Sequence, residues 1–335
     1  MKKVLCIALI AVLALAVLVG CGSTATGVAA GSAVTSEAAA ETGKDVASIK
    51  IGVIQLVEHD ALDAACNGFV DGLVAAGFSK DNIDVQNAQG EQANCVTIAN
   101  KFVNDKVDLI LAIATPAAQA AAQATTTIPI LVTAVTDPAS AGLVASNEVP
   151  GGNVSGTSDM NPVTEQIALL QKLVPDAKTV GVMYCSSEDN SILQAEMAVA
   201  AIEALGLEAK TYTAADSNEV QAVTQSTVGK VDALYIPTDN LFASTMDTVA
   251  LITEPNKIPV ICGESGMVEK GGLATYGIDY YKLGQQTAEQ AVDLFVNGAD
   301  ISKMPIAYSP EADLAVSVNA EMAKSIGVTI PEDLK

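Results

Sequence analysis

The sequence predicts an α/β protein of two doubly wound lobes, each built around a parallel sheet. Apolar runs of strand length alternate with helical stretches from residue 51 onward, an alternation typical of parallel sheets covered by helices. The same order of elements returns about 124 residues later, since Val231-Asp-Ala-Leu resembles Val107-Asp-Leu-Ile. Half of the residues are apolar, only 4% are aromatic, and Ala, Val and Ile dominate, as suits helices packed on buried parallel strands.

The first lobe is predicted to begin with the apolar strand 51–57. Residues 61–76 follow as a helix, because Leu62, Cys66 and Phe69 recur on one stripe. Asp60 is expected to cap this helix and Gly77 to end it. Further strands are expected at 83–85, 107–114 and 128–132, and further helices at 91–104 and 117–124.

The second lobe is predicted to repeat this order. Residues 179–184 read as its first strand, and 192–205 as the helix that Gly206 ends. Additional strands are expected at 207–211, 231–236 and 258–261. Both lobes are long enough to bury a core of their own.

The N-terminus is predicted to be a secretory signal peptide over residues 1–20. Lys2 and Lys3 precede an apolar stretch that ends at Val19. Leu18-Val-Gly-Cys21 resembles the lipobox of bacterial lipoproteins, in which the cysteine is acylated and becomes the new N-terminus. The alternative is a transmembrane helix, but the apolar run is shorter than the ~20 residues that spanning requires. Residues 21–47 are small and polar, which indicates a flexible tether.

Composition excludes several classes of function. The net charge is −22 and no basic cluster exists, so nucleic-acid binding is not expected. The chain contains no arginine, so an anionic group of a ligand would meet hydroxyls, backbone N–H groups or lysine rather than a guanidinium fork. Cys66, Cys95, Cys185 and Cys262 show no CxxC spacing and are expected to be buried thiols, although disulfides remain open. No metal site, cofactor motif or enzyme signature is present, and an enzyme is not expected.

Candidate ligand-binding residues lie where the predicted strands end, because ligands of open parallel sheets bind beyond the carboxyl ends of the strands. Helix capping is the competing interpretation for Ser187, Asn190 and Asp137, whereas Glu58 and Glu264 are not expected to be caps. His59, the only histidine, sits in such a loop, where a packing or hydrogen-bonding role is the commoner one. The candidate set is Gln55, Glu58, His59, Thr115, Thr136, Asp137, Tyr184, Ser186, Ser187, Asn190, Asp239, Asn240, Glu264, Tyr276 and Asp279.

Six segments together resemble the ABC-transporter substrate-binding lipoproteins of the tryptophan/tyrosine-binding type. They are residues 55–63, 114–120, 133–138, 153–159, 235–240 and 271–281, and the likeness covers roughly residues 48–335. The resemblance implies the type I periplasmic-binding-protein fold, with two lobes joined by three hinge crossovers near Gly156, Tyr280 and Pro305. The lobes would then comprise 48–156 with 281–305, and 157–280 with 306–335. Cys185 departs from the family pattern, which more often reads Tyr-Asn-Ser-Ser.

The resemblance also implies a function. The protein would be exported, anchored by lipid alone to the outer face of the cell membrane or to the periplasmic side, and would deliver an aromatic or large apolar amino acid to an ABC permease. The ligand's ammonium could pair with Glu58, Asp239 or Glu264, and its carboxylate with Ser186, Ser187, Thr115 or Thr136 at helix N-termini. Tyr184 and Tyr276 are candidates for the apolar walls. A sensory lipoprotein and a receptor for a nucleoside or other small solute remain alternatives, and sugars are disfavoured because the chain lacks tryptophan.

Overall fold

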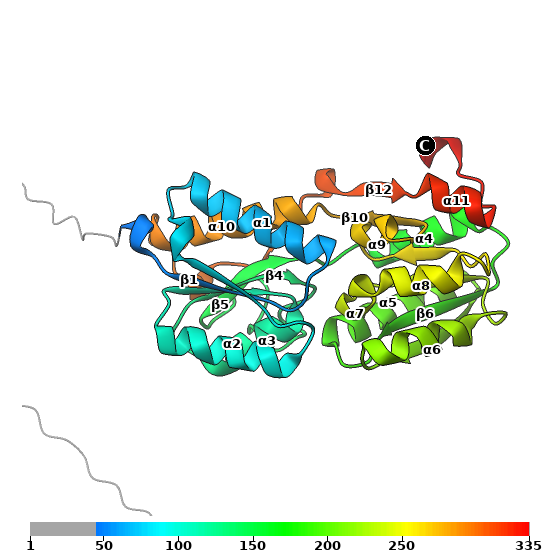
Figure 1. Ribbon diagram of the computed structural model, residues 1–335. Coiled ribbons are helices and arrows are strands. Elements are labelled where there is room, and N and C mark those ends of the chain that lie inside the picture. The colour runs from blue at the N-terminus through cyan, green and yellow to red at the C-terminus, as the bar shows by residue number, and fades with distance from the viewer. Residues whose placement is uncertain (1–44, 335) are drawn as a thin grey trace, which may run out of the picture. The chain divides into compact units, whose positions relative to one another are not determined.

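The computed structural model describes residues 45–334 as an α/β protein with two six-stranded sheets (Figure 1). The signal peptide, Cys21 and most of the tether lie outside the described residues. Within residues 45–334 no helix is long and apolar enough to cross a membrane.

The first sheet has the order β11-β5-β4-β3-β1-β2 and is parallel throughout. Its strands are β1 (Ile51–Gln55), β2 (Ile83–Asn87), β3 (Leu109–Ile113), β4 (Ile130–Val135), β5 (Val154–Ser158) and β11 (Ala307–Tyr308). Its helices are α1 (Asp60–Ala75), α2 (Gln92–Asp105), α3 (Thr115–Ala124) and α10 (Tyr280–Phe295). Figure 1 shows α1 and α10 on one face of this sheet and α2 and α3 on the other.

The second sheet has the order β12-β10-β9-β8-β6-β7 and is parallel except for β12, which pairs antiparallel with β10. Its strands are β6 (Thr179–Cys185), β7 (Glu208–Ala214), β8 (Ala233–Ile236), β9 (Val260–Cys262), β10 (Ala274–Gly277) and β12 (Ala315–Val318). Its helices are α4 (Val163–Leu173), α5 (Asp189–Ala204), α6 (Ser217–Thr227), α7 (Asn240–Ser244), α8 (Met246–Thr253), α9 (Ser265–Glu269) and α11 (Ala320–Ile326).

The cores follow the two-residue period of the strands. In β8, Ala233 and Tyr235 pack on one face with residues of α4, α5 and α11, whereas Leu234 and Ile236 pack on the other with residues of α6, α7 and α8. The first lobe has one continuous core around β1, β3 and β4, whose side chains are all buried. The predicted strands and helices of both lobes are therefore confirmed in type and order. One detail is wrong: His59, rather than Asp60, is the N-cap residue of α1.

The chain passes between the two sheets three times, at residues 159–162, 278–279 and 309–314, which we call the first, second and third crossovers. All three expected boundaries shift, the second by one residue, because Tyr280 already belongs to α10 of the first lobe. Thr157 and Ser158 complete β5, and Ala307 and Tyr308 pair with them as β11, so the first sheet keeps all four residues. A two-residue strand gives no periodicity from which its sheet could be predicted.

Helices α1 and α10 touch backbone to backbone because each presents a glycine at the contact. A Cβ atom on Gly68 would lie 2.0 Å from the carbonyl oxygen of Tyr281, and one on Gly284 would lie 2.0 Å from that of Ala65. This contact holds α10, which follows the second crossover, against the first helix of the chain.

Candidate functional site

The carboxyl ends of the strands of the two sheets meet at one junction. Loops after β1, β3, β4 and β5 supply residues from the first lobe, and loops after β6, β8 and β9 supply them from the second. Three hydrogen bonds join the lobes here: Gln194 Nε2 donates to Thr136 Oγ1 at 3.1 Å, Gln119 Nε2 donates to Asp189 Oδ2 at 2.8 Å, and His59 Nε2 lies 3.3 Å from Asn240 Oδ1. The predicted layout of polar loops facing one another across a junction is thus what the structure has.

The partners of His59 define its tautomer. Asn240 Nδ2 donates to Glu188 Oε2 at 2.5 Å, so Asn240 turns its oxygen toward the imidazole, and His59 Nε2 must carry the proton. The other nitrogen, Nδ1, is then an acceptor, and it is buried without a partner. Burial lowers the pKa of His59 to about 4, which outweighs the opposing effects of Asn240 and Asp60, so the ring is neutral.

Four buried polar atoms at the junction lack a hydrogen-bond partner. They are His59 Nδ1, Thr115 Oγ1, Asp159 Oδ1 and Asn190 Oδ1. Buried polar atoms in proteins are normally paired, because leaving one unpaired costs about 1–3 kcal/mol. Three of the four are acceptors only, and the hydroxyl can donate or accept. The junction is therefore suited to a small ligand that brings several donors.

Two cavities flank the residues at which α3 and α5 begin. One has a volume of about 390 Å³ and is lined by Leu56, Val57, Pro116, Cys185, Ser187, Glu188, Asn240 and Leu241, among others. The other, of about 300 Å³, is lined by residues that include Thr115, Asp137 and Asn190. Both lie within or close to the size range of small-molecule sites. No lysine lines either cavity, so the carboxylates there face no cation of the protein.

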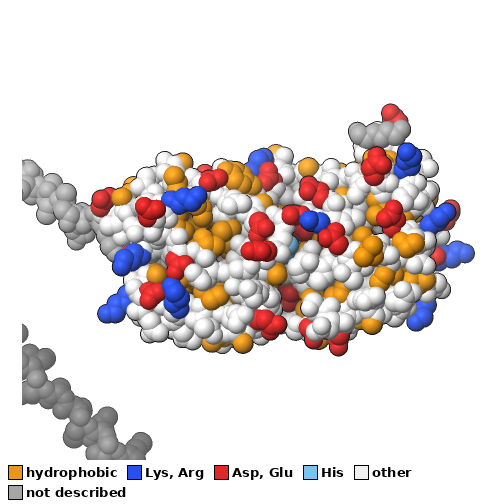
Figure 2. Space-filling model, viewed as in Figure 1, with side chains coloured by type: hydrophobic (Ala, Val, Ile, Leu, Met, Phe, Trp, Pro, Cys, Tyr) orange, Lys and Arg blue, Asp and Glu red, His pale blue; other side chains and the backbone are white. Residues whose placement is uncertain are grey.

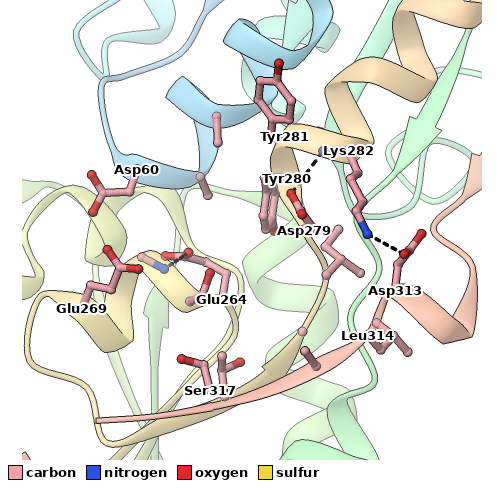
Figure 3. A pocket seen from close by; sticks show the side chains of 18 of the residues that line it. Asp60, Glu264, Glu269, Asp279, Tyr280, Tyr281, Lys282, Asp313, Leu314 and Ser317 are labelled. Atoms are coloured by element: carbon pink, nitrogen blue, oxygen red, sulfur yellow. Dashed lines mark hydrogen bonds and ion pairs between the residues drawn. The ribbon is translucent and has the colours of Figure 1, made fainter.

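A larger groove of about 1020 Å³ lies beside the second and third crossovers (Figure 3). Several of its polar groups already have partners in the protein. Lys282 Nζ pairs with Asp313 at 2.7 Å, Tyr281 donates to Asp71 at 3.0 Å, and Asp279 accepts from the backbone N–H of Lys282. Acidic side chains are prominent along the junction of the lobes in Figure 2, yet no group of His, Cys, Asp or Glu in residues 45–334 has the arrangement of a metal site. We therefore place the candidate site at the strand ends rather than in this groove.

Two of the predicted ammonium partners serve as helix caps. Glu264 is the N-cap of α9 and accepts from the backbone N–H groups of Gly266 and Met267 at 2.5 and 2.8 Å, so the expectation that it would not cap is wrong. Asp239 is the N-cap of α7, accepts from Phe242 N at 2.9 Å, and with its other oxygen accepts from Cys185 N at 2.6 Å. Each carboxylate is thus committed to the backbone of the second lobe.

Replacing Asp239 by alanine is expected to lower the free energy of unfolding by about 2 kcal/mol, because two buried N–H groups lose their acceptor. Urea denaturation followed by circular dichroism measures the change. Asp216→Ala is the matched control: Asp216 also caps a helix, but it is exposed and accepts only from Asn218 N. An equal loss in the two variants would contradict a structural role for Asp239 beyond capping.

The other predicted residues divide into those at the junction and those away from it. Ser187 lines the 390 Å³ cavity and donates to Ala215 O at 3.1 Å, and Glu58 is exposed beside a pocket of about 190 Å³. Asp137 is held by its own loop, accepting from Ala139 N and Asn147 Nδ2. Residues that the structure places elsewhere are Gln55, which donates to Asp63; Ser186, which is exposed; Asp279, at the crossover groove; and Tyr184 and Tyr276, which pack against a core of the second lobe instead of lining any cavity above.

Residues at the junction that were not among the predicted set include Gln119, Asp159, Glu188, Asp189 and Gln194. Asp159 follows β5, whose sequence VSGTS does not read as a buried strand, although Ser155 and Thr157 satisfy their hydroxyls on Met304 O and Thr133. Glu188 and Gln194 lie on or next to α5. On a helix, the sequence alone does not distinguish a buried polar residue from one that faces solvent.

The four cysteines in the described part of the chain are buried and form no disulfide.

Two α/β lobes with facing strand ends and three crossovers define a two-lobed solute-binding fold. Solved structures of solute-binding proteins with only 12–16% identity share it, at TM-scores of 0.57–0.60. The family model of ABC transporter substrate binding proteins matches residues 50–335, and the chain belongs to that family.

Several relatives are more similar. A tyrosine-binding protein of Clostridioides difficile is 42% identical over 319 residues, covering 94% of this chain and 90% of its own. An ABC domain from Streptococcus pneumoniae, solved with L-Trp, is 38% identical with a TM-score of 0.82, and covers 85% of this chain and 97% of its own. A ligand-free, open substrate-binding protein from Clostridium difficile is 50% identical over the same shares, yet its TM-score is 0.65. The relative described as open thus has the higher identity but the lower TM-score, and in the present structure three hydrogen bonds join the lobes.

Proposed function

We propose that this protein captures an aromatic or large apolar amino acid between its lobes and delivers it to the permease of an ABC importer. The observation that carries the proposal is the junction itself, where Glu188 lines one cavity, Thr115 and Asn190 with their unpaired oxygens line the other, and no lysine lines either. An α-ammonium group supplies the missing donors. The names of the relatives, one tyrosine-binding and one solved with L-Trp, support the choice of an aromatic amino acid.

The ligand's carboxylate has a matching place at the start of α3. Thr115 begins this ten-residue helix, and its buried hydroxyl has no partner. The first N–H groups of a helix are free and favour an anion, although Pro116, the second residue of α3, contributes no N–H. Because the chain has no arginine, this combination replaces a guanidinium. Leu56, Val57, Pro116 and Leu241 supply apolar contacts for the side chain.

The proposal also covers the place of action. The lipobox resemblance at Cys21 supports export and lipid anchoring, with residues 21–47 as a tether. The protein then meets its ligand outside the cytoplasm and releases it, unaltered, to a permease. Capture without chemistry is consistent with the family, whose members bind substrate for a transporter.

Titration calorimetry of the mature protein tests this function. We expect saturable binding of L-tyrosine or L-tryptophan with a dissociation constant in the micromolar range or below, and recovery of the unchanged amino acid by mass spectrometry. L-Leucine, adenosine and glucose serve as comparisons for the other ligand classes. Binding of adenosine or glucose in preference to every amino acid would overturn the proposal, as would conversion of the amino acid into a product.

A further inference from the structure

Four carboxylates are buried at or beside the junction, and they differ in how many hydrogen bonds their oxygen atoms accept. Both oxygens of Asp239 and both oxygens of Glu264 accept backbone N–H groups. Glu188 accepts side-chain amides from Asn190 and Asn240. Asp159 is the exception, since Oδ2 accepts from the Tyr280 hydroxyl at 2.8 Å while Oδ1 is buried with no donor.

No lysine neutralises Asp159. It is only 2% exposed, and none of the ion pairs found in residues 45–334 involves it. Burial raises its pKa to about 6, an effect that the hydroxyls of Tyr280 and Thr136 only partly offset. A buried carboxylate with one bare oxygen is costly by itself, and it becomes favourable when a cation pairs with it.

The surroundings of Asp159 are those of the lobe junction. Thr136, whose hydroxyl accepts from Gln194 of the second lobe, lies beside it. Asn161 in the same crossover donates to Thr238 Oγ1, and Thr238 O accepts from Asn190, whose own Oδ1 lacks a partner. The hydrogen bonds of Asn161 and Thr238 thus run from the crossover that holds Asp159 to Asn190 in the second lobe. A primary ammonium has three donors and no acceptor, so it suits the unpaired carboxylate oxygen of Asp159.

Asp159 also connects two of the crossovers. It lies in the first, and Tyr280, which donates to it, is the residue directly after the second and begins α10 (Figure 3). A parallel link runs from the backbone N–H of Ile278 to Asn161 Oδ1 at 3.2 Å. Any group held by Asp159 is therefore held at the hinge of the two lobes.

We propose that Asp159 accepts hydrogen bonds from the ligand's ammonium on Oδ1. Its Oδ2 accepts from Tyr280, so the bound ligand is linked to both the first and the second crossover. The proposal rests on the function proposed above and names the ammonium partner, in place of Glu58, Asp239 and Glu264. Ligands with a primary ammonium beside a carboxylate are then the selected class. Analogues that lack the ammonium leave Asp159 unpaired on closure.

Calorimetry on matched variants tests this role. Asp159→Asn keeps the shape but removes the charge, and we expect it to weaken L-tyrosine binding by at least about 30-fold. The desamino analogue 3-(4-hydroxyphenyl)propanoate is expected to bind both proteins equally weakly. Glu203→Gln removes an equal charge from the exposed far end of α5 and is expected to bind like the wild type. Tyr280→Phe is expected to cause a smaller loss, about threefold to tenfold.

The outcomes separate the two proposals. If the wild type binds no amino acid, the proposed function fails before Asp159 is tested. If the wild type binds L-tyrosine and Asp159→Asn binds it equally well, the role of Asp159 is wrong while the function stands, and a large loss in Glu188→Gln would then assign the ammonium to Glu188. Should Asp159→Asn not fold, as judged by circular dichroism, unchanged L-tyrosine affinity in Tyr280→Phe would equally overturn the link to the crossover.

Discussion

Replacing Gly284 by alanine is expected to lower the free energy of unfolding by about 3 kcal/mol, at the upper end of the usual cost of overpacking. The new methyl group would stand 2.0 Å from the carbonyl oxygen of Ala65. Two backbones meet at this point, so no flexible side chain can move aside, and α1 and α10 must separate. Separation also opens the core beneath them, where Phe69 and Leu283 are buried.

Urea denaturation of Gly284→Ala beside Gly152→Ala measures this cost. Gly152 has no atom within 4 Å of the position that a Cβ would take, and its backbone φ is not positive. We expect the control to change stability by no more than about 0.5 kcal/mol. Equal stability of the two variants would show that α1 and α10 do not approach as closely as described.

The ligand-free protein is expected to be more stable at pH 5.5 than at pH 8, by about 2 kcal/mol. Burial raises the pKa of Glu188 and of Glu264 to about 7, and that of Asp159 to about 6. Between pH 4 and 7 the folded protein therefore holds protons that the unfolded chain has lost, and the free energy of unfolding falls as the pH rises through this window. His59 acts in the opposite sense, because its neutral form stabilises the fold above pH 6.5 and that contribution is lost toward pH 4. The three carboxyl groups together change the free energy of unfolding more than the one imidazole does, so the protein is expected to be less stable at the higher pH.

The midpoint temperature of thermal unfolding, measured across this pH range and again at about 0.5 M salt, distinguishes the contribution of buried charges to stability from that of exposed charges. Salt screens the exposed charges of this acidic chain much more than the buried ones. The matched variant is Glu188→Gln, which keeps an acceptor for Asn190 and Asn240 and is expected to flatten the pH dependence at either ionic strength. A midpoint that rises from pH 5.5 to pH 8 would contradict the assignment of uncompensated buried carboxylates.

The strands that were predictable from sequence are the buried ones. Ile51–Gln55 and Leu109–Ile113 lie under helices on both faces, so they read as continuous apolar runs. Strand β12 is an exposed edge strand, β11 has two residues, and β5 buries hydroxyls that find partners only in the folded protein. Their sequences lack the pattern because tertiary contacts, and not local hydrophobicity, place them.

The candidate site was predictable in location but less so in chemistry. Polar residues after the strands indicated the junction, and His59, Thr115, Thr136, Asn190 and Asn240 lie there. A carboxylate after a strand can either cap the next helix or bind a ligand, and the same residue types serve both roles. Only the hydrogen bonds of Asp239 and Glu264 show that they cap. Asp159 lies in one of the segments that carry the family resemblance, but it was not predicted as a ligand-binding residue because the VSGTS sequence before it does not read as a buried strand.

The three crossovers have a consequence for the order in which the chain can fold during its synthesis. The second sheet draws all but β12 from one stretch, 179–277, so most of it can assemble as soon as that stretch is available. Most of the first sheet is synthesised earlier, but its folding is completed later, because it requires α10 and β11 at residues 280–308. Until then the surfaces of α1 and β4 that pack against α10 have no cover. The N-terminal part of the nascent chain is therefore where a chaperone is most needed.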